Sequence, residues 1–125
     1  MRPHDFRWVL FGALALGFVI WIQAAAEPGG NALKGRPIYE KNCLLCHGPQ
    51  GRGDGPMGKA LSPPAANFSS PESMRKTDAE LLKVIHEGHP DTAMTAWKGS
   101  LSEQEFQDLL AYVRHLSRGL DKGKS

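Results

Sequence analysis

Cysteine is scarce in this chain: the 125 residues contain two, Cys43 and Cys46. A framework of several disulfides is therefore excluded, and so is a zinc site, which would need a second pair of ligands at suitable spacing. One bridge between residues this close in sequence would close a very small loop and would stabilise the chain little. The chemistry of the two cysteines must therefore be sought in their immediate neighbourhood.

An excess of charge of one sign is also missing. Lys and Arg together number 15, against 13 for Asp and Glu. Nucleic acid as a partner would demand a strong basic excess, so the balance predicts that the chain binds none. Alternation of apolar and polar residues at strand spacing is absent as well, which predicts an all-α fold.

The two cysteines belong to the run Cys43-Leu44-Leu45-Cys46-His47. A Cys-x-x-Cys-His run is the attachment site of a c-type haem, in which each cysteine forms a thioether and the histidine is held against the iron. A dithiol redox motif is the alternative, but that chemistry needs a thiolate of low pKa and does not require the histidine. The run predicts one covalently bound haem c on Cys43 and Cys46.

Only one long apolar run occurs, from Val9 to Ile22, after a polar start that holds Arg2 and Arg7. Small residues follow at 24–26, which predicts that residues 1–26 are a signal peptide and that residues 27–125 form one compact domain, which carries the haem. The length of the run lies near the upper end of the roughly 7–15 apolar residues typical of a signal peptide. It falls short of the about 20 residues of a membrane-spanning helix, which favours cleavage. Residues 8–26 would just span a bilayer, so a membrane anchor is the alternative. Both place the domain in the periplasm or on the outer face of the cytoplasmic membrane.

The rest of the chain divides into helices and one long loop. A first helix is expected to begin near Arg36, with Pro37 in its first turn. The stretch from Gly48 to Pro71 holds so many glycines and prolines that no regular element is expected there. Two further helices are predicted by capping boxes at Thr77 to Glu80 and at Ser102 to Glu105. Gly88 and Gly119 are expected to end them.

A haem iron that carries electrons needs a sixth ligand, because a closed coordination sphere changes little between oxidation states. The candidates are Met57, Met74, Met94, His86, His89 and His115. Met94 lies between the two C-terminal helices, where a loop can swing over the far face of the porphyrin. His86 and His89 would give a bis-histidine haem of lower potential, although histidine also suits a helix end.

Most of the chain resembles a small class I monohaem cytochrome c, of the bacterial group that also supplies subunits and domains of respiratory complexes. The matching segments are Ile38-Tyr39-Glu40, Cys46-His47-Gly48, Gly51 to Pro56, Pro63-Pro64 with Asn67-Phe68, Met94 with Trp97, Leu101-Ser102 and Tyr112-Val113. The resemblance implies three to four helices around one haem, with His47 and Met94 as iron ligands. It also implies that a carbonyl near Pro63 or Pro64 accepts the His47 ring N–H. Thr95 stands where the family commonly has proline.

These features predict electron transfer between redox proteins outside the cytoplasm, without a catalytic site of the chain's own. A haem subunit of a respiratory oxidoreductase or oxidase complex, anchored by the N-terminal helix, is the alternative. A sensor that binds ligands at an open sixth position would require Met94 not to bind the iron.

Overall fold

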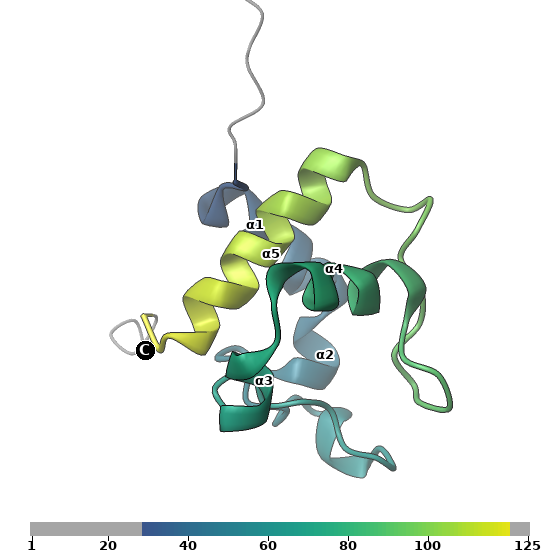
Figure 1. Ribbon diagram of the computed structural model, residues 1–125. Helices are drawn as coiled ribbons and strands as arrows, with labels where there is room; N and C mark the ends of the chain where they lie inside the picture. Colours follow the sequence, from purple (N-terminus) through teal and green to yellow (C-terminus); the bar gives the residue numbers. More distant parts are fainter. Residues whose placement is uncertain (1–28, 121–125) are drawn as a thin grey trace, which may run out of the picture.

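The computed structural model describes residues 29–120, so the predicted leader, residues 1–26, lies outside the described residues. Three longer helices form the frame: α1 (Ala32–Asn42), α4 (Asp78–Glu87) and α5 (Glu103–Ser117). Two short helices, α2 (Leu44–His47) and α3 (Pro71–Arg75), lie between them in the chain, with a 3-10 turn η1 (Gly58–Ala60) (Figure 1). Residues 29–120 contain no strand, and the predicted all-α fold is confirmed.

None of the helices within residues 29–120 is sufficiently long and apolar to cross a membrane.

Helix α1 begins four residues earlier than the sequence predicts. Instead of starting near Arg36, it follows Asn31, whose side chain accepts a hydrogen bond from the backbone N–H of Leu33 at 2.9 Å. Pro37 therefore lies inside the helix, not in its first turn. The cost is one helical hydrogen bond to the carbonyl of Leu33, and Pro37 is itself exposed. A strong N-cap has outweighed the usual place of proline.

α1 and α5 cross at close range (Figure 1). Gly35 makes this approach possible, because a Cβ there would lie 2.5 Å from the carbonyl carbon of Asp108. The buried carboxylate of Asp108 accepts the backbone N–H of Asn31 at 2.7 Å and the side-chain amide of Gln104 at 3.1 Å. The start of the domain is thus tied to the middle of its last helix.

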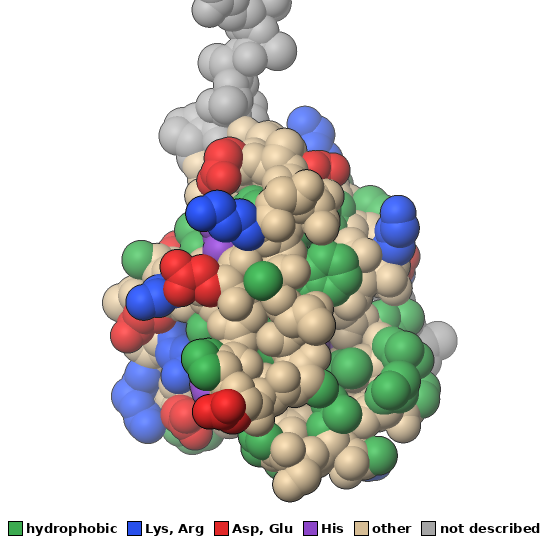
Figure 2. All heavy atoms as spheres, turned by 90° about the vertical axis from the view of Figure 1, so that its right-hand side faces the viewer, with side chains coloured by type: hydrophobic (Ala, Val, Ile, Leu, Met, Phe, Trp, Pro, Cys, Tyr) green, Lys and Arg blue, Asp and Glu red, His purple; other side chains and the backbone are tan. Residues whose placement is uncertain are grey.

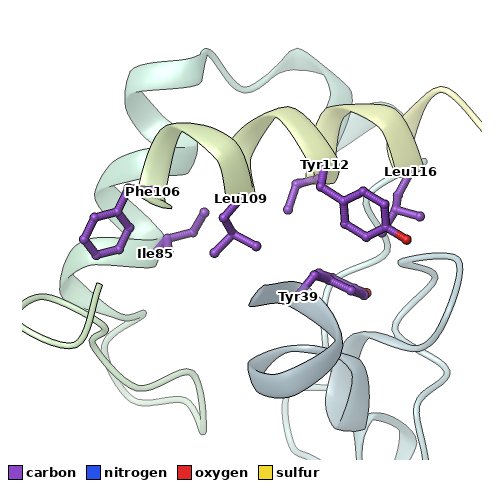
Figure 3. Close-up of a cluster of buried hydrophobic side chains, with 7 residues drawn as sticks. Tyr39, Ile85, Phe106, Leu109, Tyr112 and Leu116 are labelled. Atoms are coloured by element: carbon purple, nitrogen blue, oxygen red, sulfur yellow. The ribbon is translucent and has the colours of Figure 1, made fainter. Parts of the chain in front are cut away.

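The core is formed where α5 meets α1 and α4. Figure 3 shows the side chains that share it: Tyr39 from α1, Ile85 from α4, and Phe106, Leu109, Tyr112 and Leu116 from α5. The α5 residues recur at helical spacing, so one face of that helix supplies most of the apolar surface. Tyr39, Phe106, Leu109 and Leu116 are each no more than 2% exposed.

Both predicted capping boxes are present. The side chains of Thr77 and Glu80 cap α4 reciprocally, and those of Ser102 and Glu105 do the same for α5. Gly88 ends α4 in the left-handed region, at φ +75°. These local signals fix the bounds of both helices, and therefore the length of the connection between them.

The predicted loop from Gly48 to Pro71 is mostly irregular, with two departures. The turn η1 lies inside it, and helix α3 begins at its last residue, Pro71. Ser70 caps α3, accepting the backbone N–H of Ser73 at 3.2 Å. A serine followed by proline at the first helical position is a helix start, which the density of glycine and proline upstream conceals.

Candidate functional site

The end of α1 and the single turn of α2 bring the cysteines and the histidine of the motif together. Cys43 closes α1, its backbone N–H donating to the carbonyl of Tyr39 at 2.8 Å. Its own carbonyl accepts the backbone N–H groups of Cys46 at 3.2 Å and His47 at 2.9 Å. The two cysteines are half-buried and form no disulfide. Burial, and then the neighbouring Cys46, raises the pKa of the Cys43 thiol to about 12, which disfavours the thiolate that a dithiol redox motif needs.

His47 is held in one orientation. Its Nδ1 lies 3.2 Å from the carbonyl oxygen of Ala66, and its ring stacks on that of Phe68 with centroids 4.7 Å apart. Because a carbonyl only accepts, Nδ1 carries the proton and the lone pair of Nε2 is left for a ligand. Burial lowers the pKa of His47, and the bond to Ala66 raises it in part. The acceptor is the carbonyl of Ala66, two residues after Pro64 and thus near the position that the resemblance implied.

The glycine-rich loop folds back onto α2. The backbone N–H of Gly53 donates to the carbonyl of His47 at 2.9 Å, and that of Gly55 to the carbonyl of Cys46 at 3.2 Å. The last carbonyls of a helix have no partner inside it, and here the loop supplies the missing donors. Glycine is required for the approach, because a Cβ on Gly58 would collide with the carbonyl oxygen of Cys46. The loop thus fixes the motif through hydrogen bonds to the carbonyls of α2.

Tyr39 connects α1 to the start of this loop. Its hydroxyl donates to the carbonyl of Gly48 at 2.6 Å, and its ring meets those of Phe68 and Tyr112 edge to face, at 6.3 and 5.3 Å. Burial is the main cause that raises the pKa of Tyr39. In the sequence analysis, Tyr39 and Phe68 occur only among the segments that resemble the family, and neither is predicted to support the site. The position of Tyr39, an aromatic residue one helical turn before Cys43, could have indicated its role.

Met94 lies on the connection between α4 and α5, which descends on the right of Figure 1. Among the methionines of residues 29–120 it alone is half-buried, whereas Met57 and Met74 are 49% and 53% exposed. The connection is fixed to α4 by the backbone N–H of Trp97, which donates to the carbonyl of Ile85 at 3.1 Å. His47 and Met94 thus come from different segments of the chain.

The other histidines have contacts of their own. The ring of His86 packs on Phe106 with centroids 3.8 Å apart, and its Nε2 lies 3.9 Å from a carboxylate oxygen of Glu103. The Nδ1 of His89 lies 3.1 Å from the carbonyl of the next residue. His115 stacks on the neighbouring tyrosine of α5 at 5.9 Å. These contacts favour structural roles for the three residues.

Figure 2 shows the side of the molecule that lies to the right in Figure 1. Hydrophobic side chains gather over the lower right of this face, and charged side chains lie mainly toward its left and upper margins. Two large apolar residues of the site's own segments are exposed: Leu45, within the motif, and Met57, in the loop that folds back on it. Within residues 29–120, no cluster of three His, Cys, Asp or Glu side chains is arranged to hold a metal ion.

Comparison with known proteins agrees with this arrangement. Residues 30–113 match the family described as cytochrome c oxidase, cbb3-type, subunit III. The cbb3-type cytochrome c oxidase subunit FixP of Bradyrhizobium diazoefficiens is 33% identical over 92 residues, which are 73% of this chain. Cytochrome c-554(547) of Halothiobacillus neapolitanus is 31% identical over 94 residues, 70% of this chain and 98% of that protein.

A solved structure, the KustC0563 c-type cytochrome, superposes with a TM-score of 0.57 at 29% identity, over 66% of this chain and 95% of that one. The match to FixP spans only 29% of that longer protein. The family match, residues 30–113, contains the motif, the loop that folds back on it and the Met94 connection. The chain belongs to the family of cytochrome c domains described as cytochrome c oxidase, cbb3-type, subunit III.

Proposed function

We propose that this domain transfers electrons between redox proteins through one haem c, bound covalently by Cys43 and Cys46, with His47 and Met94 as axial ligands. The orientation of His47 carries the proposal. Its Nδ1–H is directed to the carbonyl of Ala66, so its Nε2 is the nitrogen left for iron, and two unpaired cysteines lie within the same helical turn.

The residues fit a porphyrin in two further respects. Cys43 and Cys46 are not joined in a disulfide, so each thiol is free to add across a vinyl group. The bond from His47 to Ala66 raises the basicity of the imidazole and fixes its plane, which Phe68 supports by stacking. The haem supplies an iron that changes its oxidation state by one electron.

The position of Met94 supports its assignment as the second ligand. It is half-buried on a connection that is fixed to α4, whereas the other methionines of the described range are exposed. With His47 holding a haem, a thioether from Met94 would raise its reduction potential. His86, His89 and His115 are engaged by other groups.

A second candidate is a haem subunit fixed in a respiratory oxidase or oxidoreductase complex and anchored through residues 8–26. The match to an oxidase subunit favours it, whereas the match over 98% of cytochrome c-554(547) favours a small cytochrome c. Both place the domain outside the cytoplasm, where it passes electrons on without catalysing a reaction. The mass of the mature chain, and whether it purifies alone, separates the two.

Absorption spectra of the haem-loaded protein test the proposal. The ferric protein should show the band of a sulfur–iron bond, and Met94→Ala should lose it, lower the reduction potential and bind carbon monoxide when reduced. Met57→Ala, which removes an exposed methionine near the motif, is the matched control and should keep the band. The double variant Cys43→Ala with Cys46→Ala should release its haem in denaturant.

Three results would contradict the proposal. Haem that stays attached to the double variant would exclude thioethers to these cysteines. An unchanged spectrum in Met94→Ala would move the sixth ligand elsewhere. A wild-type protein with high-spin iron that binds carbon monoxide readily would make a ligand-binding sensor the better reading.

A further inference from the structure

The side chain of Thr92 and backbone hydrogen bonds together close the turn that precedes Met94, and the backbone N–H of Thr92 donates to the carbonyl of His89 at 3.3 Å. The Thr92 hydroxyl donates to the carbonyl of His89 at 2.9 Å and accepts the backbone N–H of Met94 at 3.1 Å. The backbone N–H of His89 donates in turn to the carbonyl of Met94 at 3.1 Å. Both backbone polar groups of Met94 are therefore engaged within this turn, one of them by a hydroxyl.

The backbone around this turn is compact and conformationally demanding. Gly88 is buried at φ +75°, and a Cβ there would lie 2.6 Å from the carbonyl oxygen of Met94. Asp91, at the tip, adopts φ +58°, which costs a residue with a side chain about 1 kcal/mol. A turn of this shape needs bonds that offset its cost, and the bonds of Thr92 span it from one end to the other.

Beyond Met94 the chain is fixed by backbone groups alone. The N–H of Trp97 donates to the carbonyl of Ile85, and that of Lys98 to the carbonyl of His86, both at 3.1 Å. These two bonds supply partners for carbonyls at the end of α4. The chain is thus fixed both before and after Met94. Of these two segments, only the turn before Met94 depends on the hydroxyl of Thr92.

We propose that Thr92 is a positioning residue that keeps Met94 in place to bind the haem iron. This inference rests on the proposed ligation by Met94. It assigns Thr92 a role toward the iron that acts through the backbone of Met94 and not through contact with the haem. The strength of the iron–sulfur bond against competing ligands should therefore depend on the Thr92 hydroxyl.

Thr92→Val tests this, because valine keeps the branched shape and removes the hydroxyl. In the ferric haem-loaded protein, imidazole must displace Met94 to bind, so its apparent affinity reports how firmly Met94 is held. We expect Thr92→Val to bind imidazole about tenfold more tightly than the wild type, since two hydrogen bonds to a partly exposed turn are lost. The sulfur–iron band should weaken and the reduction potential should fall. Thr92→Ser should restore all three.

Thr95→Val is the matched control. Thr95 follows Met94, is exposed, and makes no hydrogen bond within the described part of the chain. The inference is overturned if Thr92→Val binds imidazole like Thr95→Val, or if serine does not restore the wild-type affinity. If Thr92→Val does not fold with haem, Thr92→Ala against Thr92→Ser makes the same comparison.

Met94→Ala, measured alongside, distinguishes a failure of the proposed ligation from a failure of the role of Thr92. If it binds imidazole like the wild type, Met94 is not the ligand, and the proposed ligation fails together with the role of Thr92. If Met94→Ala binds imidazole far more tightly while Thr92→Val does not, the ligation stands and only the role of Thr92 falls.

Discussion

Replacing Gly35 by alanine should force α1 and α5 apart. The new Cβ would lie 2.5 Å from the carbonyl carbon of Asp108 and 2.9 Å from the backbone nitrogen of Leu109, and closer still to the carbonyl oxygen of Asp108. All three are backbone atoms of a helix, so no side chain can rotate out of the way. The helices must separate by at least several tenths of an ångström along the crossing that closes the domain.

The size of the effect follows from two opposing contributions. Overpacking a well-packed interface costs about 1–3 kcal/mol, and a rigid backbone contact lies at the upper end of that range. Alanine in place of glycine inside a helix returns up to about 1 kcal/mol through helix propensity. We therefore expect the free energy of unfolding to fall by about 2 kcal/mol.

Urea unfolding of the haem-loaded protein, followed by far-ultraviolet circular dichroism, measures this change. A loss of 2 kcal/mol should lower the midpoint by about 1 M, with an unchanged slope. Gly99→Ala is the control, because Gly99 has open space around it and a φ of +84°. This variant should lose only about 1 kcal/mol of unfolding free energy, from the backbone conformation alone. A Gly35→Ala protein as stable as the wild type would refute the close crossing.

Two further changes test the frame of the site. Tyr39→Phe removes the hydroxyl that donates to the carbonyl of Gly48, and it should cost about 1–2 kcal/mol of unfolding free energy by the same urea measurement; a loss within error would show that water replaces the bond. Hydrogen bonds from the backbone and side chain of Ser102 lower the pKa of Glu105 in the folded state. The stabilisation is therefore present above the ordinary value of 4.5 and is lost as the pH falls through the lower, folded value. Glu105→Gln should accordingly shrink the drop in urea midpoint between neutral and acid pH, whereas Glu87→Gln, on an exposed glutamate outside any cap, should leave that drop unchanged.

Features with a local cause could be predicted from the sequence. The capping boxes at Thr77 and Ser102 involve groups three residues apart, and the stop at Gly88 needs only the conformational freedom of glycine. The Cys-x-x-Cys-His run is likewise a short-range signal, which predicts chemistry from spacing alone. The all-α class followed from the absence of strand periodicity.

Features that depend on distant or backbone partners could not be predicted in the same way. The acceptor of the His47 ring is a carbonyl, which every residue has, so only the path of the loop selects Ala66. The hydroxyl of Thr92 finds both partners because a turn brings them to it. The predicted start of α1 was wrong because Pro37 and Asn31 give competing signals for the first residue of the helix. The N-cap at Asn31 determines the start, since the hydrogen bond that proline cannot make lies at an exposed position.

The crossing of α1 and α5 also sets how chain entropy is distributed over the fold. The hydrogen bond from Asn31 to Asp108 joins residues 77 apart in sequence, whereas that from His47 to Ala66 joins residues 19 apart. Closing the longer segment costs about 1 kcal/mol more in loop entropy. The segment with the motif can therefore order at a smaller entropic cost than the crossing of α1 and α5. Docking of α5 recovers the larger cost through the core that it buries.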